Sequence, residues 1–427
     1  MTVARSPQAA GLAPSRAVLD NGVVILAKEA TTTAAVSINL AVRAGSACDP
    51  TGAEGTAWLL SRVIDRGTES RSAAQVAEEL DGRGITLSIS VTRHVFSIAC
   101  TCLAEDFDPI LELLADTLMR PAFPEDELAI RKGEVITAIR QDEDNPAVRA
   151  NEMLMSRLYP DGHPYGRPTK GTIDIVERLG RRELLRQHAM RFDPAELTAV
   201  IVGDVPAPHA QEVTARVFAD WRRAESPLLV LPSVRPATRR ETTVIPMMNK
   251  AQADIAYGFT SVTRHDPDYY AFWLMNNAFG QYSIGGRLGD SIREKQGMAY
   301  YVSSSLDANV AEGPLAIRAG VSPANVDRAI ASIDEEIRRL VADGLTPQEL
   351  DESKQFLIGS MPRALETNTG IANFLQNAEF FGLGLDYDLQ LPGKLRAVTL
   401  DAANAAARRV LDVDRATVVI AGPYARR

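Results

Sequence analysis

Hydrophobic residues recur with helical spacing in two segments that lie far apart in the chain. The clearer stripe ends before Gly344 and consists of Val326, Ile330, Ile333, Ile337 and Leu340. A period near 3.6 residues predicts an amphipathic helix, and a similar stripe runs from Ala104 to about Met119. A second helix start follows each stripe, at Phe123–Leu128 and at Leu345–Leu350, and the two starts lie 222 residues apart.

Apolar strands repeat at almost the same distance. Thr198–Gly203 and Thr417–Gly422 are short apolar runs that both end in glycine, and they lie 219 residues apart. Two matches at nearly one offset indicate the duplication and fusion of a unit of roughly 200 residues. In the later helix start, Thr346 and Glu349 have the spacing of a capping box, which predicts where that helix begins.

Strands also occur in adjacent pairs, and these pairs indicate the fold class. Ile85–Val91 is followed at once by Val95–Cys102, as expected for antiparallel neighbours. Each repeat then contains two strands, helices, a strand pair, long helices and a closing strand. We predict an α+β protein of two similar domains, each a mainly antiparallel sheet with helices packed on one face.

A proline-rich stretch divides the two repeats. Regular patterns break down there around Pro227, Pro232 and Pro236. Because proline interrupts both helices and strands, the sequence predicts a first domain at 15–222, a linker at 223–241 and a second domain at 242–427.

Composition and charge exclude several classes of protein. The 427 residues are 45% hydrophobic and 24% charged, which is typical of globular proteins. The net charge of −9 comes without a basic block, so we expect no nucleic-acid partner. No apolar run approaches the roughly 18 residues of a membrane span, and Met1–Ser15 lacks the pattern of a secretory signal. We therefore expect no membrane association and a cytoplasmic location.

Two cysteines could suggest a metal site, because Cys100 and Cys102 form a C-x-C pattern. They continue the alternation of Phe96 and Ile98, so both side chains should point into the core from one strand. Buried free cysteine behaves as a small hydrophobic residue, and core packing is the favoured interpretation over metal binding.

An ordered set of motifs resembles those of the pitrilysin/insulinase-like peptidases, the inverzincin family. The motifs are His163–Thr172, Phe192–Pro194, Val200–Asp204 and Gly286–Tyr300. The resemblance extends from about Leu19 to Gly422 and implies the two-domain α+β fold that the repeat indicates on its own.

The metal-binding motif of that family is degenerate in this chain. Active members carry H-x-x-E-H on a helix, with two histidines as zinc ligands and a glutamate that activates water. The similar helix here is Gly55–Thr68, where Trp58, Ser61 and Arg62 stand at the three positions. The resemblance places Ala138 at the position of the distal glutamate ligand.

The chemistry of these residues leaves no metal site. Tryptophan and protonated arginine offer a cation no lone pair, alanine has no ligand, and serine is no base at neutral pH. None of the histidines lies three or four residues from another; they are His94, His163, His188, His209 and His265. A zinc site built from distant histidines stays open as an alternative, but we predict that this chain binds no cofactor.

The second-domain motif is intact. Arg293 falls near the end of a predicted helix at Arg287–Lys295, and Tyr300 falls at the start of a predicted strand. The resemblance implies that this Arg/Tyr pair binds substrate and stabilises the transition state at a zinc site. Tyr301 competes for the role, because successive strand residues face opposite ways. In the alternative interpretation Arg293 only pairs with Asp290 or Glu294 on the surface, and Tyr300 is an ordinary strand residue.

The loss of the metal motif and the retention of the Arg/Tyr motif together predict that this chain is one subunit of an enzyme. We expect a non-zinc-binding partner of a zinc-bearing homologous chain, the two forming a heterodimeric zinc metallopeptidase that cleaves peptides or unfolded proteins. One alternative is an inactive scaffold similar to the core proteins of a respiratory complex. Another is the recognition subunit of a processing peptidase, which has a long glycine-rich loop where this chain has only Gly280, Gly285 and Gly286.

Overall fold

The computed structural model describes residues 11–224, 229–281 and 285–425 and contains two β-sheets in this part of the chain. The first sheet has the order β1-β2-β6-β3-β5-β4. Its strands are β1 (Ser15–Val18), β2 (Val24–Glu29), β3 (Ala35–Val42), β4 (Ser88–Val91), β5 (Phe96–Leu103) and β6 (Leu197–Gly203). The second sheet has the order β7-β11-β8-β10-β9. Its strands are β7 (Glu241–Pro246), β8 (Ala253–Thr260), β9 (Ala299–Leu306), β10 (Pro314–Val321) and β11 (Thr417–Gly422).

The two sheets repeat one topology. When β1 is left out, the order β2-β6-β3-β5-β4 of the first sheet corresponds strand by strand to the order β7-β11-β8-β10-β9 of the second. In both sheets one pair is parallel, β2–β6 and β7–β11, and the other neighbours are antiparallel. The prediction of two similar α+β domains with mainly antiparallel sheets is confirmed.

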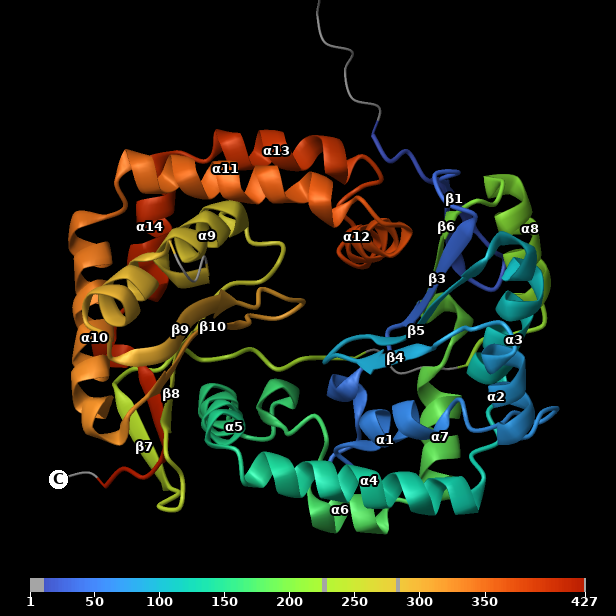
Figure 1. Cartoon of the computed structure of the whole chain (residues 1–427), viewed down its shortest axis with the longest axis horizontal. Helices are drawn as coiled ribbons and strands as arrows, with labels where there is room; N and C mark the ends of the chain where they lie inside the picture. Colours follow the sequence, from blue (N-terminus) through green and yellow to red (C-terminus); the bar gives the residue numbers. More distant parts are fainter. Residues whose placement is uncertain (1–10, 225–228, 282–284, 426–427) are drawn as a thin grey trace, which may run out of the picture.

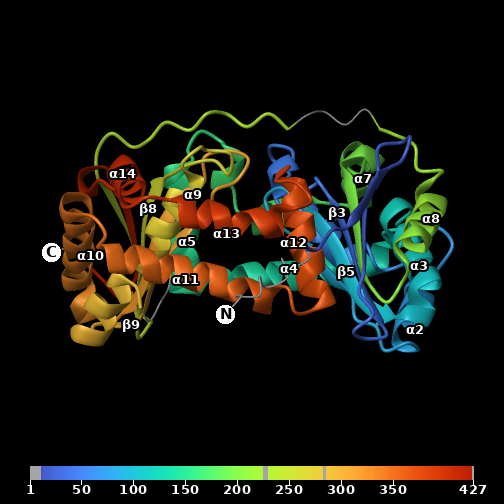
Figure 2. The same cartoon turned by 90° about the horizontal axis from the view of Figure 1, so that it is seen from above.

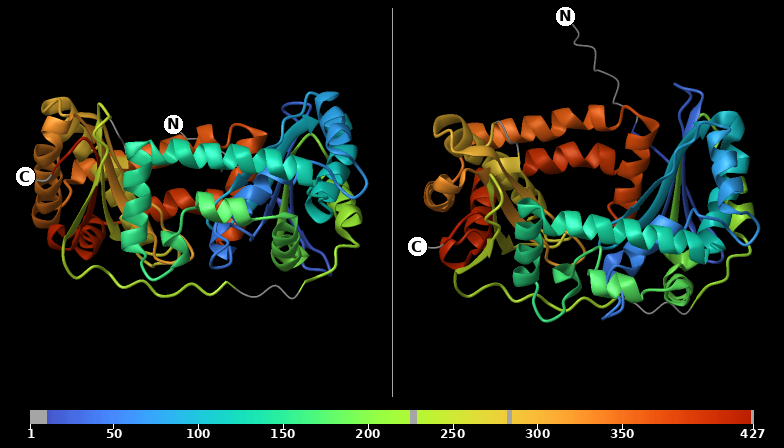
Figure 3. Two further views of the ribbon diagram at one scale, coloured as in Figure 1. Left: turned by 90° about the horizontal axis from the view of Figure 1, so that it is seen from below. Right: turned by 60° about the horizontal axis from the view of Figure 1, so that its bottom comes forward.

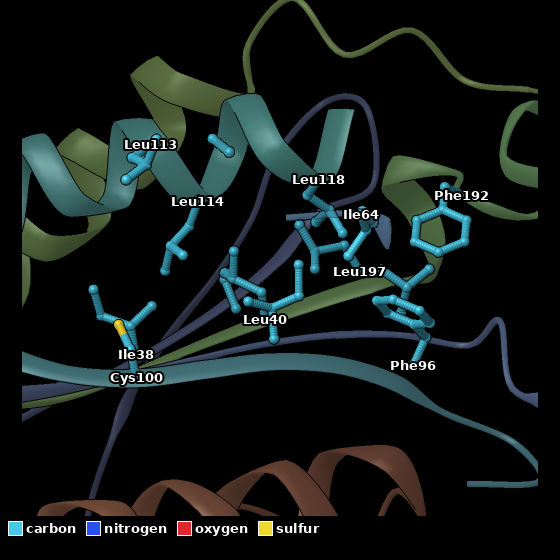
Figure 4. Packing of buried hydrophobic residues seen from close by; sticks show 14 of the residues in the cluster. Ile38, Leu40, Ile64, Phe96, Cys100, Leu113, Leu114, Leu118, Phe192 and Leu197 are labelled. Atoms are coloured by element: carbon cyan, nitrogen blue, oxygen red, sulfur yellow. The ribbon is translucent and has the colours of Figure 1, made fainter. Parts of the chain in front are cut away.

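Helices cover one face of each sheet and enclose a core. On the first sheet these are α1 (Thr56–Val63), α2 (Ala73–Asp81), α3 (Phe107–Met119), α7 (Arg181–Arg191) and α8 (Ala207–Phe218). On the second sheet they are α9 (Tyr269–Asn276), α10 (Val326–Asp343), α13 (Tyr387–Ala397) and α14 (Leu400–Val410). Figure 4 shows Leu113 and Leu114 of α3 above Ile38 and Cys100 of the sheet. Cys100 and Cys102 are both buried in this core, as predicted.

Two long helices extend as arms from one half toward the other. In the first half α4 (Glu125–Glu143) leads to α5 (Pro146–Leu158), and α6 (Ile173–Arg178) lies against α4. In the second half α11 (Pro347–Ala364) leads to α12 (Asn368–Phe380). Figures 1 and 3 show α4 and α11 on opposite sides of the molecule. The Thr346–Glu349 capping box at the start of α11 is present, which confirms its predicted start.

Each arm delivers a helix to the sheet of the other half. Helix α5 packs on β8 and β11 of the second sheet, and α12 packs on β3 and β6 of the first. Each of these helices covers the face of the other half's sheet that the helices of that other half leave open (Figure 1). The α5 contact has an apolar core that includes Leu154, Leu158 and Val419, and Asn151 of α5 accepts a hydrogen bond from Arg318 of β10 at 2.7 Å. The α12 contact adds polar pairs, among them Ser37 with Thr369 and Asn39 with Asn373.

The described residues of the segment between α8 and β7 lie along one side of the molecule (Figure 2). Its described residues, 219–224 and 229–240, contain no helix or strand. Residues 225–228 of the predicted linker lie outside the described part of the chain, and β7 begins at Glu241, the last residue of that predicted linker. In the described part of the chain, no helix has the length and apolar composition that a bilayer crossing requires.

Candidate functional site

The helix with the degenerate metal motif is firmly anchored at its start. Gly55 precedes α1 with a φ of 92°, and a Cβ at Gly55 would lie 2.3 Å from the carbonyl oxygen of Lys170. The carboxylate of Asp49 accepts hydrogen bonds from the N–H groups of Gly55 and Ala57 at 2.8 and 2.9 Å. Burial raises the pKa of Asp49 to about 7. The start of α1 is therefore fixed by a buried carboxyl and by the close approach of the Lys170 loop.

Two side-chain cations lie where the resemblance places the metal. The Arg62 guanidinium lies 5.2 Å and the Lys170 ammonium 5.5 Å from the centre of the Trp58 ring. Lys170 also pairs with Asp142 of α4 at 2.5 Å. Trp58, Asp142 and Lys170 line a pocket of about 370 Å³ beside Val91 of β4. Positive charge at this position disfavours a divalent cation.

The remaining replaced positions have no free metal-binding group. Ser61 is buried, and its hydroxyl donates to the Trp58 carbonyl at 2.7 Å. Ala138 lies on α4, which contacts α1. Within residues 11–224, 229–281 and 285–425, no three or more His, Cys, Asp or Glu side chains are grouped so as to hold a metal ion.

The histidines are dispersed and serve other contacts. His94, His163 and His188 are bonded to the Tyr165 hydroxyl, the Pro232 carbonyl and the Leu118 carbonyl. His209 contacts Asp108, and the His265 ring packs edge-on against Phe381. Burial lowers the pKa of His94 and of His188 to about 4. In the described chain these residues do not form a site of distant histidines.

Arg293 lies on an irregular helix of the second half. Residues Gly289–Lys295 form a π-helix, a rare conformation that often marks functional sites. Gly297 then turns the chain with a φ of 60°, and its N–H group donates to the Arg293 carbonyl at 3.0 Å. The Arg293 side chain is 43% exposed and lies 3.6 Å from Glu294. Among exposed groups such a contact is weak, so Arg293 is available to a partner or substrate.

Tyr300 is the extra residue of a β-bulge. Ala299 pairs with Val321 and Tyr301 with Gly320, so Tyr300 has no counterpart on β10. Bulges break the alternation of side chains and are frequent next to active sites. Ala299 and Val302 both pack in the helix-side core, and the two tyrosines between them lie outside it. Because of this bulge, alternation along the strand does not by itself place Tyr300 and Tyr301 on opposite faces.

The hydroxyl groups distinguish the two tyrosines. Tyr301 donates to Asp254 of β8 at 2.5 Å, and burial together with this carboxylate raises the pKa of Tyr301. Tyr300 is 66% exposed, and its hydroxyl makes no hydrogen bond to any residue that the structure describes. It lies on β9, the edge strand of the second sheet.

The structure keeps the two sets of predicted site residues on separate halves. Trp58, Ser61 and Arg62 lie on α1 of the first half, and Arg293 and Tyr300 lie near β9 of the second (Figure 1). The sequence does not predict that Lys170 and Asp142 lie near Trp58, because nothing in their local pattern relates them to that residue.

Two models of known protein families match this chain. The model described as "Insulinase (Peptidase family M16)" matches residues 24–173, and the model described as "Peptidase M16 inactive domain" matches residues 178–357. The chain belongs to peptidase family M16. Its first M16 domain contains the degenerate helix α1, and the match to the inactive domain contains Arg293 and Tyr300.

M16 relatives match over nearly the whole chain. An uncharacterised zinc protease of Bacillus subtilis is 25% identical, covering 94% of this chain and 96% of the relative. A non-peptidase homologue of Helicobacter pylori is 24% identical, covering 86% and 84%. The crystal structure of a peptidase M16 inactive domain from Pseudomonas fluorescens superposes with a TM-score of 0.90 at 25% identity, covering 97% of this chain and 98% of that one. The chain is thus an insulinase-like M16 member without the zinc site.

Proposed function

We propose that this chain is the zinc-free subunit of a heterodimeric M16 zinc peptidase, to which it contributes Arg293 and Tyr300. The observation that carries the proposal is the contrast between the two halves. In the first half, Trp58, Ser61 and Arg62 stand at the three positions of the H-x-x-E-H motif. In the second half, Tyr300 presents on a bulge an exposed hydroxyl that makes no hydrogen bond to the described residues. A chain with no function at an active site would have no need of this free donor.

The chemistry of such a pair suits attack on a peptide carbonyl. A zinc ion held by the partner chain would activate the attacking water, and negative charge would then develop on the peptide carbonyl oxygen. A tyrosine hydroxyl that donates to this oxygen stabilises the transition state. The Arg293 guanidinium can orient the hydroxyl or hold a neighbouring substrate carbonyl. Zinc and the general base would come from the partner chain.

The proposed partner is a homologous M16 chain with an intact H-x-x-E-H helix. The two chains would close around a peptide or unfolded segment, since closure excludes water and completes the site. Tyr300 lies on β9, the edge strand of its sheet, and extended peptides can bind to an edge strand as an added strand. The division at 15–222, 223–241 and 242–427 and the cytoplasmic location remain predictions.

An inactive scaffold is the second candidate, favoured by the relative of Helicobacter pylori that is described as a non-peptidase homologue. A scaffold accounts for the loss of the metal ligands equally well. It gives no reason for an exposed tyrosine on a bulge whose hydroxyl makes no hydrogen bond to any described residue.

Mixing the purified chain with a zinc-bearing M16 chain from the same genome tests the proposal. Hydrolysis of an internally quenched peptide should be much faster for the mixture than for the zinc-bearing chain alone. Metal analysis of this chain by itself should find no stoichiometric zinc. A mixture no faster than the zinc-bearing chain, with a stable complex still formed, would favour the scaffold.

A further inference from the structure

A hydrogen-bonded cluster holds the residue next to Tyr300. The Tyr301 hydroxyl donates to Oδ1 of Asp254, and Nε2 of Gln252 donates to the same oxygen at 2.9 Å. Asp254 is only 3% exposed, and the structure records no ion pair for it among the described residues. A buried carboxylate binds strongly to the few donors it has. The outer end of Tyr301 is therefore fixed to β8, two strands away from its own backbone.

The Tyr301 ring fits over a glycine on the intervening strand. Gly320 of β10 is the pairing partner of Tyr301. A Cβ at Gly320 would lie 2.4 Å from Cε1 of Tyr301 and 2.4 Å from Nε2 of Gln252. Only glycine leaves room for the ring to cross β10 and reach Asp254.

These contacts lie directly on the bulge. Gly320 with Tyr301 is the ladder pair on one side of Tyr300, and Val321 with Ala299 is the pair on the other side. Ala299 is held by burial in the helix-side core. The direction of an unpaired bulge residue depends on how its two neighbours are held. Tyr301 is thus one of the two points that set the orientation of Tyr300.

We infer that Asp254, Gly320 and Tyr301 are positioning residues that aim the Tyr300 hydroxyl at the substrate. This inference rests on the proposed function of Tyr300. Tyr301 cannot itself be the oxyanion donor, because its hydroxyl points into the sheet and is engaged by Asp254. Fixing the neighbour while leaving Tyr300 unbonded gives a donor whose direction is set before substrate arrives, and preorganisation of this kind is what makes such donors effective.

The test uses the two-chain peptide assay with Tyr301→Phe and Asp254→Asn in this chain. Tyr301→Phe removes the Tyr301–Asp254 bond, and Asp254→Asn replaces the charged acceptor of that bond with a weaker neutral one. Both substitutions change the side-chain volume little. We expect Tyr301→Phe to lower kcat about tenfold and Asp254→Asn to lower it less, while KM stays within twofold, since substrate binding is not altered. Gly320→Ala displaces the ring by steric contact and should lower kcat in the same way.

Tyr257→Phe provides a matched control. It removes a similar bond, from the Tyr257 hydroxyl to Asp334 at 3.0 Å, in the same sheet but on the helix-side core. We expect kcat to be unchanged. Thermal unfolding of every variant reports whether the fold is intact.

A double-mutant cycle separates positioning from a general structural effect. If Tyr301 acts through Tyr300, then Tyr301→Phe should cost nothing more in a Tyr300→Phe background. An equal loss of kcat in both backgrounds, or no loss from Tyr301→Phe in the wild type, would overturn the inference while leaving the role of Tyr300 intact. If Tyr300→Phe alone has no effect, both the inference and the proposed function are overturned.

Discussion

The three residues that stand in the H-x-x-E-H positions of α1 have local contacts of their own. Trp58 offers its ring to two cations, and the hydroxyl of Ser61 is bonded back to the helix. Arg62 and Lys170 bring positive charge to the place where the M16 zinc would bind. The first half has therefore not merely lost ligands but has acquired contacts that favour the metal-free state.

At the residue scale, Asp49 should make the stability of the folded chain depend on pH. Its pKa rises from 3.8 to about 7 on folding, so between these values the folded chain retains a proton that the unfolded chain releases. The contribution of Asp49 to stability is present below about pH 4 and is lost as pH rises through about 7. We expect Asp49→Asn to remove this loss. Urea unfolding of both proteins from pH 4 to 8 measures it, and parallel stability curves would contradict the assignment.

The two elements that carry the proposed donors are both irregular. Arg293 lies on a π-helix and Tyr300 on a β-bulge, and the regular elements beside them hold them in place. Arg287, just before the π-helix, forms two bonds to Glu349 at 2.5 and 2.8 Å and one to the Gly344 carbonyl. The start of α11 therefore anchors the helix that presents Arg293.

Glu349→Ala tests this anchor. The substitution removes both the capping box and the Arg287 pair, and it leaves a half-buried guanidinium without its carboxylate. We expect a loss of about 1.5–3 kcal/mol in the free energy of unfolding, measured by urea denaturation. Glu352→Ala, one turn later in the same helix, removes an exposed bond from Gln348 and should cost less than about 0.5 kcal/mol. Equal losses would contradict the anchoring role.

At the scale of the whole molecule, the two halves are joined by an exchange of helices. Helices α5 and α12 occupy equivalent places in the repeat, yet their contacts differ in character. The α5 contact has the larger apolar cluster and also includes the bond from Arg318 to Asn151. The α12 contact has the smaller cluster, with Ile371 and Leu375, and several polar pairs. We therefore expect the α5 contact to contribute more to the attachment of the halves.

Leu154→Ala and Asn373→Ala compare the two contacts. Leu154 of α5 is fully buried, and truncating a buried leucine typically costs about 2–5 kcal/mol. Asn373 bonds to Asn39 at 3.3 Å, and its loss should cost about 1 kcal/mol. Denaturant unfolding measures both. A larger loss from Asn373→Ala would contradict the predicted difference.

The sequence predicts features that depend on local periodicity and misses those that depend on long-range contact. The strand pairs, the start of α11 and the helix that carries Arg293 follow from spacing within short segments, and the repeat follows from comparing such segments along the chain. The exchange of α5 and α12 needs knowledge of which sheet each helix meets. The bulge at Tyr300 breaks the alternation on which strand prediction relies, and Lys170 reaches Trp58 from more than a hundred residues away.

The most direct test of the central claim is the rate of peptide hydrolysis by the two-chain mixture with Tyr300→Phe in this chain. The substitution removes only the hydroxyl of an exposed residue, so the fold and complex formation should be unaffected. The account predicts a fall in kcat of about 10²–10³-fold, with little change in KM. A mixture that contains Tyr300→Phe and cleaves the peptide at the wild-type rate would contradict it.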